Sequence, residues 1–263
     1  MKAKNRPIFS LGMPSILLRL TLFTSILFSL VLVSCASRQT TVPLEPGDEL
    51  ERATAYFENK RYENAAKSFE KIIFYYPSSE YVDDAQFWLG RSYFGEKDYD
   101  QAIIEFDYLI KNFSNSLFVE DAYFYRAQAY ILKTPGYTKD QTELNMALNL
   151  LDEFLTRYPN SQRTAEVREL ILTARDRLAK KELENGKLYV KLNKLDAALI
   201  YFEFVIQTYP ETKSSNEAKY QMAKIFEKKG KPEAALALYK ELLEDETWMK
   251  EAEKRIKKIE KDG

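Results

Sequence analysis

Residues 65–79, Ala-Ala-Lys-Ser-Phe-Glu-Lys-Ile-Ile-Phe-Tyr-Tyr-Pro-Ser-Ser, decide the fold. A small residue, Ala65, is followed four positions later by a large one, Phe69, and the stretch ends in Tyr-Pro and then Ser. Proline cannot continue a helix, and Ser or Thr favours the start of the next one. The stretch therefore predicts the end of one helix, a tight turn and a cap of the next helix at Ser79. Ser116, Ser161 and Thr212 follow the later copies in the same way and are expected to cap as well.

The same spacing recurs along the chain. The small and large residues return as Ala102 and Phe106, Ala147 and Leu151, Ala198 and Phe202, and Ala235 and Tyr239. Gly90 with Tyr93, and Gly186 with Tyr189, stand in the helices that precede two of these copies. Small residues let two helices approach closely, and the aromatic residue fills the space beside them. Together these residues match the tetratricopeptide (TPR) pattern of about 34 residues.

The repeats predict an all-α fold, a superhelical array of about five TPR helical hairpins. The five alanines are separated by 37, 45, 51 and 37 residues, so two repeats contain extra material. We expect a loop from Lys133 to Thr142 and a lengthened helix from about Thr164 to Lys191. Arrays of this kind present a concave face that binds extended peptides or partner helices.

Residues 1–34 resemble a lipoprotein signal peptide. They carry four basic residues and no acid, and the apolar run from Leu20 to Val33 is shorter than the roughly 20 residues of a spanning helix. The run ends in Leu32-Val33-Ser34-Cys35, which is similar to a lipobox. This resemblance implies cleavage before Cys35 and acylation of that residue. A plain signal peptide with an incidental cysteine and a short membrane anchor are the alternatives.

The sequence thus divides into a signal peptide (1–34), an acylated cysteine with a flexible tether (35–47), and a TPR array with a C-terminal capping helix (48–263). Two or three acyl chains hold a protein durably on a membrane. The residue after the cysteine is Ala36. In well-studied Gram-negative bacteria, an Asp at this position favours retention of a lipoprotein in the inner membrane. We therefore expect a lipid anchor in the outer membrane. The basic tail from Trp248 to Gly263 is interpreted as the cap, and a helix that docks a partner is the alternative.

The composition argues against an enzyme. The chain has no histidine and a single cysteine, which removes the commonest general base and rules out an internal disulfide or a multi-thiolate metal site. We expect no cofactor and no bound metal. Without residues 1–34 the chain carries 35 basic and 40 acidic residues, a net charge of about −5, so we expect no nucleic-acid partner.

Beyond the repeat itself, the chain resembles the BamD (ComL) family, lipoproteins of the outer-membrane β-barrel assembly machine. The resemblance rests on the lipobox, the five repeats and four segments, 76–81, 98–103, 158–161 and 178–183, the last of which leads into the long fourth hairpin. It implies a scaffold on the periplasmic face of the outer membrane that binds the assembly subunit with soluble periplasmic domains, other assembly lipoproteins and unfolded outer-membrane proteins. The chain departs from the repeat pattern at Phe113-Ser114, where an aromatic residue followed by proline is expected.

Residues on the inner face of the first helix of each early repeat are the candidates for a peptide-binding groove. They are Phe57, Asp84, Phe87, Arg91, Phe94, Phe124 and Gln128. Aromatic rings beside an arginine suit a peptide that ends in an aromatic residue and a free carboxylate. The alternatives are that the rings pack between hairpins and that Arg91 pairs with a neighbouring acid.

Two other functions remain open on the sequence. One is a different TPR lipoprotein of the envelope, such as a pilotin for a pilus secretin or a cell-wall coordination factor. The other is an envelope enzyme with an atypical acidic site built on pairs such as Asp83-Asp84, although no nucleophile motif or phosphate loop lies nearby.

Overall fold

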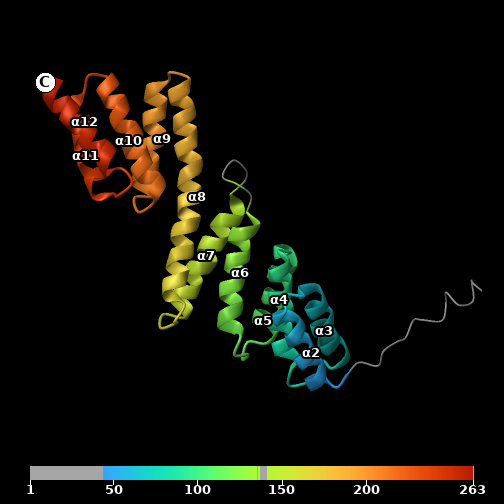
Figure 1. Cartoon of the computed structure of the whole chain (residues 1–263). Coiled ribbons are helices and arrows are strands. Elements are labelled where there is room, and N and C mark those ends of the chain that lie inside the picture. The colour runs from blue at the N-terminus through green and yellow to red at the C-terminus, as the bar shows by residue number, and fades with distance from the viewer. Residues whose placement is uncertain (1–43, 135, 137–140, 263) are drawn as a thin grey trace, which may run out of the picture. The chain divides into compact units, whose positions relative to one another are not determined.

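The computed structural model describes residues 44–134, 136 and 141–262, and every regular element within them is helical. The helices follow one another as antiparallel hairpins (Figure 1). The pairs are α2 (Pro46–Glu58) with α3 (Tyr62–Tyr75), α4 (Val82–Glu96) with α5 (Tyr99–Asn112), α6 (Val119–Lys133) with α7 (Thr142–Arg157), α8 (Thr164–Lys191) with α9 (Leu195–Thr208), and α10 (Lys213–Lys228) with α11 (Pro232–Glu241). A short 3₁₀ helix (Leu242–Glu244) and α12 (Met249–Asp262) follow. The predicted all-α array of five TPR hairpins is confirmed.

Several predictions concern residues that the structure does not describe. The signal peptide, Cys35 and most of the tether lie outside the described residues, as does most of the loop expected between Lys133 and Thr142. Within the predicted tether, Pro46 already opens α2, a position where the missing N–H of proline costs no hydrogen bond. In the described part of the chain, no helix has both the length and the apolar character required to cross a bilayer.

Glycines set the distance between the two helices of a hairpin. A Cβ atom on Gly90 would lie 2.8 Å from the ring of Phe106, and one on Gly186 would lie 2.5 Å from the ring of Phe202. Both rings are fully buried. The phenyl rings therefore occupy the space left by the missing side chains, as the spacing of small and large residues predicted.

The hydrophobic core continues from hairpin to hairpin. Each of its clusters draws side chains from three or more consecutive helical elements, so that each hairpin packs on the next. The first unites Ala53 of α2, Phe69 of α3 and Leu89 of α4, and the following clusters repeat this arrangement toward α12. Because buried contacts link nearest neighbours, the stability of such an array is close to a sum of local contributions.

In four of the five hairpins, the described turn between the two helices contains a residue in the left-handed backbone conformation. Lys60, Lys97, Asn193 and Gly230 have φ values of 57°, 65°, 57° and 67°, and each stands between the two helices of its hairpin. The N–H of the residue after it donates to the carbonyl of an aromatic residue of the first helix, as from Arg61 to Tyr56 at 2.9 Å. This satisfies a carbonyl that the helix end would leave unpaired. Only one of the four is glycine, so the sequence shows little sign of these turns.

The turn between hairpins differs in part from the prediction. Thr212 caps α10 as expected, accepting a hydrogen bond from the N–H of Ser215 at 3.2 Å. Ser79, Ser116 and Ser161 were expected to cap as well, and that expectation was wrong. Each stands two residues before the N-cap and its hydroxyl accepts from the N–H of that N-cap residue, which forms a local turn. The short Ser side chain thus orders the turn rather than the helix end.

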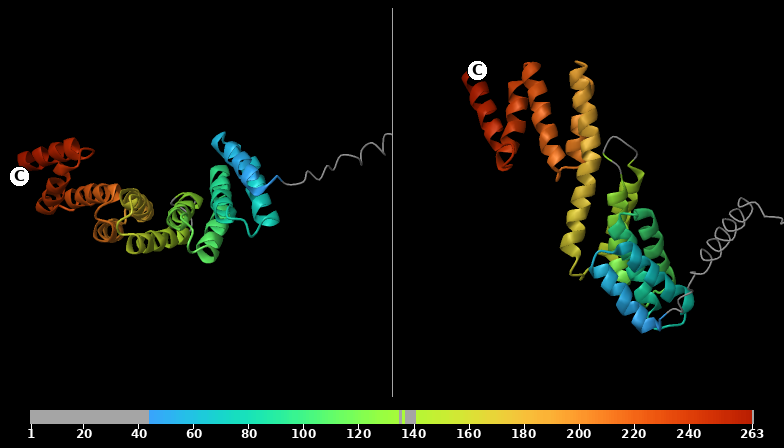
Figure 2. Two further views of the ribbon diagram at one scale, coloured as in Figure 1. Left: turned by 90° about the horizontal axis from the view of Figure 1, so that it is seen from below. Right: turned by 45° about the vertical axis from the view of Figure 1, so that its right-hand side comes forward.

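The lengthened helix is confirmed as α8, which spans the predicted residues Thr164 to Lys191. It packs against α7 near its start and against α9 and α10 further along (Figure 2). One helix therefore belongs to the core of two successive hairpins.

The last helix, α12, covers the end of the fifth hairpin. Ala252 is fully buried, and Trp248, which precedes the helix, stacks on Tyr220 of α10 with ring centres 4.6 Å apart. The hydroxyl of Tyr220 also donates to Glu251 at 3.2 Å. One face of α12 is thus committed to the array, and its lysines lie on the other.

Candidate peptide-binding surface

The first helices of the three N-terminal hairpins meet at Arg91. Its guanidinium carbon lies 3.8 Å from the ring centre of Tyr125 on α6 and 5.7 Å from that of Phe57 on α2. We use the name Arg91 cluster for Arg91, Phe57, Phe94, Tyr125 and Arg163, all of which are partly exposed. Side chains from four helical segments are therefore combined on a single surface.

The rings of the cluster are held edge-on by their neighbours. Phe57 contacts Trp88 of α4 at 4.9 Å between ring centres, and Phe94 contacts Tyr125 at 5.6 Å. Edge-to-face pairs of this kind contribute about 0.5–1.5 kcal/mol beyond the area that they bury. The surface is thus organised before any ligand arrives.

Within the part of the chain that the structure describes, Arg91 has no carboxylate partner of its own. Among the described residues it forms no ion pair, and its buried Nε finds no hydrogen-bond acceptor. Burial lowers the pKa of the guanidinium because it disfavours the charged form. The group nevertheless stays charged at neutral pH, since arginine does not deprotonate in proteins. Its planar set of donors is therefore available for an added carboxylate.

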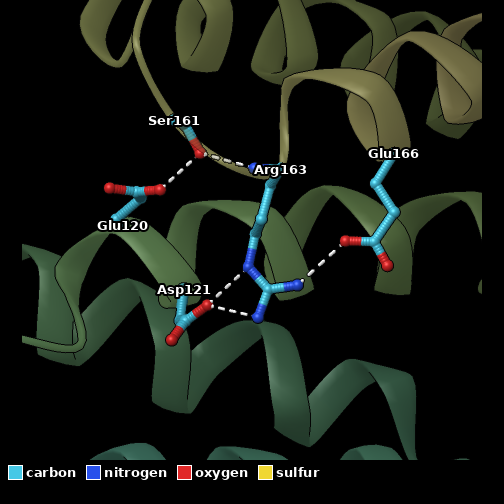
Figure 3. A network of polar contacts seen from close by, with 5 residues as sticks. All are labelled: Glu120, Asp121, Ser161, Arg163 and Glu166. Carbon is cyan, nitrogen blue, oxygen red and sulfur yellow. Dashed lines mark hydrogen bonds and ion pairs between the residues drawn. The ribbon is translucent and has the colours of Figure 1, made fainter.

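Arg163 shows the opposite arrangement (Figure 3). Its Nε donates to Asp121 at 2.7 Å, and another of its nitrogens lies 3.0 Å from Glu166. Burial opposes the charge, but the attraction and the hydrogen bond of Asp121, together with Tyr125 and Glu166, outweigh burial and raise the pKa of Arg163. Asp121, the acid available to Arg91 on α6, is thus already engaged.

A short hydrogen-bonded chain holds this second arginine in place. The Ser161 hydroxyl donates to Glu120 at 2.5 Å and accepts from the Arg163 N–H at 2.9 Å (Figure 3). It joins the turn before α8 to the first turn of α6. Arg163 lies over Tyr125 at 5.5 Å, so the two arginines lie near the same ring but differ in their charge partners.

The structure brings three of the predicted groove residues together on the surface. Two others are buried against the Arg91 cluster, with the ring centre of Phe87 5.9 Å from the guanidinium carbon of Arg91 and that of Phe124 4.7 Å from the guanidinium carbon of Arg163. Phe57, Arg91 and Phe94 belong to the Arg91 cluster. Phe87 and Phe124 are each 2% exposed and lie in the core, the packing role that the sequence left open. Asp84 on α4 and Gln128 on α6 are partly exposed. Burial, and then the neighbouring Asp83, raise the pKa of the Asp84 carboxyl.

Two members of the cluster were missed from the sequence. Tyr125 stands four residues after Asp121 and three before Gln128, so the helical period alone places it on the predicted face. Arg163 had no such signal, because its position beside Tyr125 depends on how α8 packs against α6. The helical period thus predicts which residues of one helix share a face, whereas the packing between helices decides which residues of different helices come together.

The repeats and their packing define a TPR protein. The chain matches the family model YfiO, described as outer membrane lipoprotein, over residues 47–242. The chain belongs to this family, which confirms the family predicted from the sequence and indicates the outer membrane.

Curated relatives agree with this assignment. The chain is 25% identical to the "Outer membrane protein assembly factor BamD" of Rickettsia prowazekii over 169 residues, which cover 64% of this chain and 67% of that protein. It is 31% identical to the protein of the same name in Caulobacter vibrioides over 88 residues, 34% of this chain and 29% of that one. A TPR repeats protein of Bacteroides fragilis matches 83% of this chain and 99% of its own, at 14% identity and a TM-score of 0.45.

Proposed function

We propose that the chain is a scaffold without enzymatic activity in the assembly of outer-membrane proteins. It is held by acyl chains on Cys35 at the periplasmic face of the outer membrane. Family membership and the names of the curated relatives support the assembly role. The TPR hairpins support a role in protein binding.

The Arg91 cluster carries the substrate side of this proposal. A half-buried arginine with no carboxylate partner among the described residues, surrounded by packed aromatic rings, matches a peptide terminus with an aromatic side chain and a free carboxylate. We infer that the C-terminal segments of unfolded outer-membrane proteins bind here. The ring of the peptide would pack beside Phe57 and Phe94, and its carboxylate would pair with Arg91.

A pair of synthetic peptides tests this assignment. A labelled peptide that ends in Phe with a free carboxylate is expected to bind the protein at least about tenfold more tightly than the same peptide with a C-terminal amide. The reason is that hydrogen bonds to a charged group contribute about 1.5–3 kcal/mol. Fluorescence anisotropy measures both affinities, and a peptide with Ala in place of the terminal Phe is the control for the ring. Equal affinities for acid and amide would exclude a carboxylate site at Arg91.

The partners follow from the same proposal. They are a β-barrel assembly subunit with soluble periplasmic domains and other lipoproteins of the assembly machine. A pull-down of tagged protein from gently solubilised membranes, analysed by mass spectrometry, is expected to recover that barrel subunit. Recovery of secretin or cell-wall proteins alone would instead support another kind of TPR lipoprotein.

Replacement of the acylated cysteine tests the anchor. The Cys35→Ala protein, exported with a signal peptide that is cleaved without acylation in place of residues 1–34, is expected to leave the membrane fraction, because neither an acyl chain nor the apolar run remains to hold it. Fractionation followed by immunoblotting measures this, with the unchanged chain as control. A Cys35→Ala protein that stays in the membrane fraction after high-salt washing would contradict a lipid anchor at this residue.

A further inference from the structure

Two aromatic side chains at the end of α3 remain in solvent. Phe74 is 76% exposed and Tyr75 is 55% exposed. Their ring centres lie 4.9 Å apart with the planes nearly perpendicular. The two rings therefore support each other while most of their apolar surface faces water, an arrangement that indicates a contact with another surface.

The TPR fold does not require aromatic residues at these positions. They are the two residues that precede the aromatic residue of the turn between hairpins. The corresponding pairs are Phe74-Tyr75 in the first hairpin, Lys111-Asn112 in the second, Thr156-Arg157 in the third and Gln207-Thr208 in the fourth. The pair is polar in the other three hairpins, so the aromatic character of Phe74 and Tyr75 serves a role that is specific to the first hairpin.

The aromatic pair lies where the tether reaches the array. Tyr75 lines a surface hollow together with Glu45 and Pro46, the residues that lead into α2. Nine peptide units separate Cys35 from Leu44, and such a segment spans at most about 30 Å when fully extended. With Cys35 acylated, this end of the array stays within that distance of the bilayer.

The chemistry of the patch suits the boundary between lipid headgroups and acyl chains. Aromatic side chains concentrate at that boundary, where an apolar ring and a polar edge are both accommodated. The lysines on the same face of α3 are already paired, Lys67 with Glu63 at 2.6 Å and Lys71 with Glu49 at 3.7 Å. The attraction would therefore come from the rings and not from net charge.

We propose that Phe74 and Tyr75 form a membrane-contact patch that rests on the periplasmic leaflet beside the lipid anchor. This inference depends on the acylation of Cys35 in the proposed function. The patch sets the orientation of the first hairpin relative to the bilayer, whereas the acyl chains supply the anchoring.

A fluorescent reporter beside the patch tests the contact. Once Cys35 is acylated, an introduced cysteine is the single free thiol of the mature chain. Ser78→Cys places it in the exposed turn after Tyr75, and Asn160→Cys places it at the matching position of the third hairpin, which lacks the aromatic pair. Each acylated protein, labelled with a nitrobenzoxadiazole dye, is reconstituted into vesicles of phosphatidylethanolamine and phosphatidylglycerol that contain nitroxide-labelled phosphatidylcholine.

The expected result is a loss of fluorescence at residue 78 and none at residue 160. High salt leaves the loss at residue 78 unchanged, because charges do not supply the attraction. Adding Phe74→Ser and Tyr75→Ser to the Ser78→Cys protein removes the loss, while flotation of the protein with the vesicles continues.

Each other outcome overturns the proposal in a distinguishable way. A protein that floats with the vesicles but shows equal fluorescence at residues 78 and 160 overturns the patch and leaves the anchor intact. A protein that does not float overturns the anchor and the patch together. The dye at residue 78 could also remain unquenched in vesicles while the introduced thiol at residue 78 is protected from aqueous maleimide in native membranes. That result would show that another protein, and not lipid, covers the patch.

Discussion

Replacing Phe202 with alanine is expected to lower the free energy of unfolding by about 3–5 kcal/mol, as for other fully buried phenylalanines. The ring of Phe202 is completely buried between α8 and α9 and fills the space that Gly186 leaves open. Urea denaturation measures the total loss. Hydrogen exchange should show that the loss is concentrated in α8 to α10, because each hairpin is stabilised by its neighbours. A matched Ile200→Ala protein, changed at an exposed site of the same helix, should lose far less.

Gly186 and Phe202 should also be strongly coupled. Gly186→Ala alone is expected to cost about 1–3 kcal/mol, since the new Cβ would lie 2.5 Å from the ring of Phe202. In the Phe202→Ala background the same change should become neutral or stabilising, because alanine is a better helix former than glycine by about 1 kcal/mol. A double-mutant cycle measures this coupling. Additive effects would mean that the glycine does not set the spacing of α8 and α9.

The second large effect concerns binding. Arg91→Gln is expected to weaken the binding of a peptide with a free C-terminal carboxylate by about 10–100-fold, which corresponds to the loss of one charge-assisted contact. The same variant should bind the amidated peptide as the unchanged protein does. Arg91→Glu should weaken binding of the acid further, because it places two negative charges together.

Folding must be separated from binding in this test. Arg91 forms no ion pair among the described residues, so its replacement should cost mainly the contact with the Tyr125 ring, about 0.5–2 kcal/mol, and should leave the protein folded with a slightly lower melting temperature. Arg157→Gln is a suitable control, because that arginine is half exposed on α7, pairs across one helical turn with Glu153 at 3.0 Å, and lies over an aromatic ring, that of Tyr123, at 5.0 Å. Normal capture of the acid peptide by a folded Arg91→Gln protein would remove Arg91 from the binding site.

The sequence predicted the repeats because their signal is local. Alanine, a large residue and a turn at fixed offsets specify a hairpin, and the spacing of the third and fourth alanines predicted α8 within its bounds. The turns inside hairpins were harder to foresee, since Lys60, Lys97 and Asn193 adopt a conformation for which glycine is the usual signal.

The candidate site could be predicted only in part. Helical periodicity placed Phe57, Phe87, Arg91 and Phe94 on inward faces, but it does not specify the depth of a side chain. Phe87 lies in the core against Phe118, with ring centres 4.5 Å apart, whereas Phe94 remains partly exposed. The difference arises from the neighbouring hairpin. For the same reason, the pairing of Asp121 with Arg163 was not apparent from residues 42 positions apart.

The continuity of α8 has a mechanical consequence. The helix has 28 residues, which corresponds to about 40 Å, and no proline interrupts it. Long helices curve gently and kink sharply only at a defined defect. The two hairpins that share α8 therefore have no joint between them. A displacement at the Arg163 end of α8 is therefore transmitted along the stiff helix to the Tyr189 end as a tilt or a rotation. The two hairpins respond to an applied force as one mechanical unit.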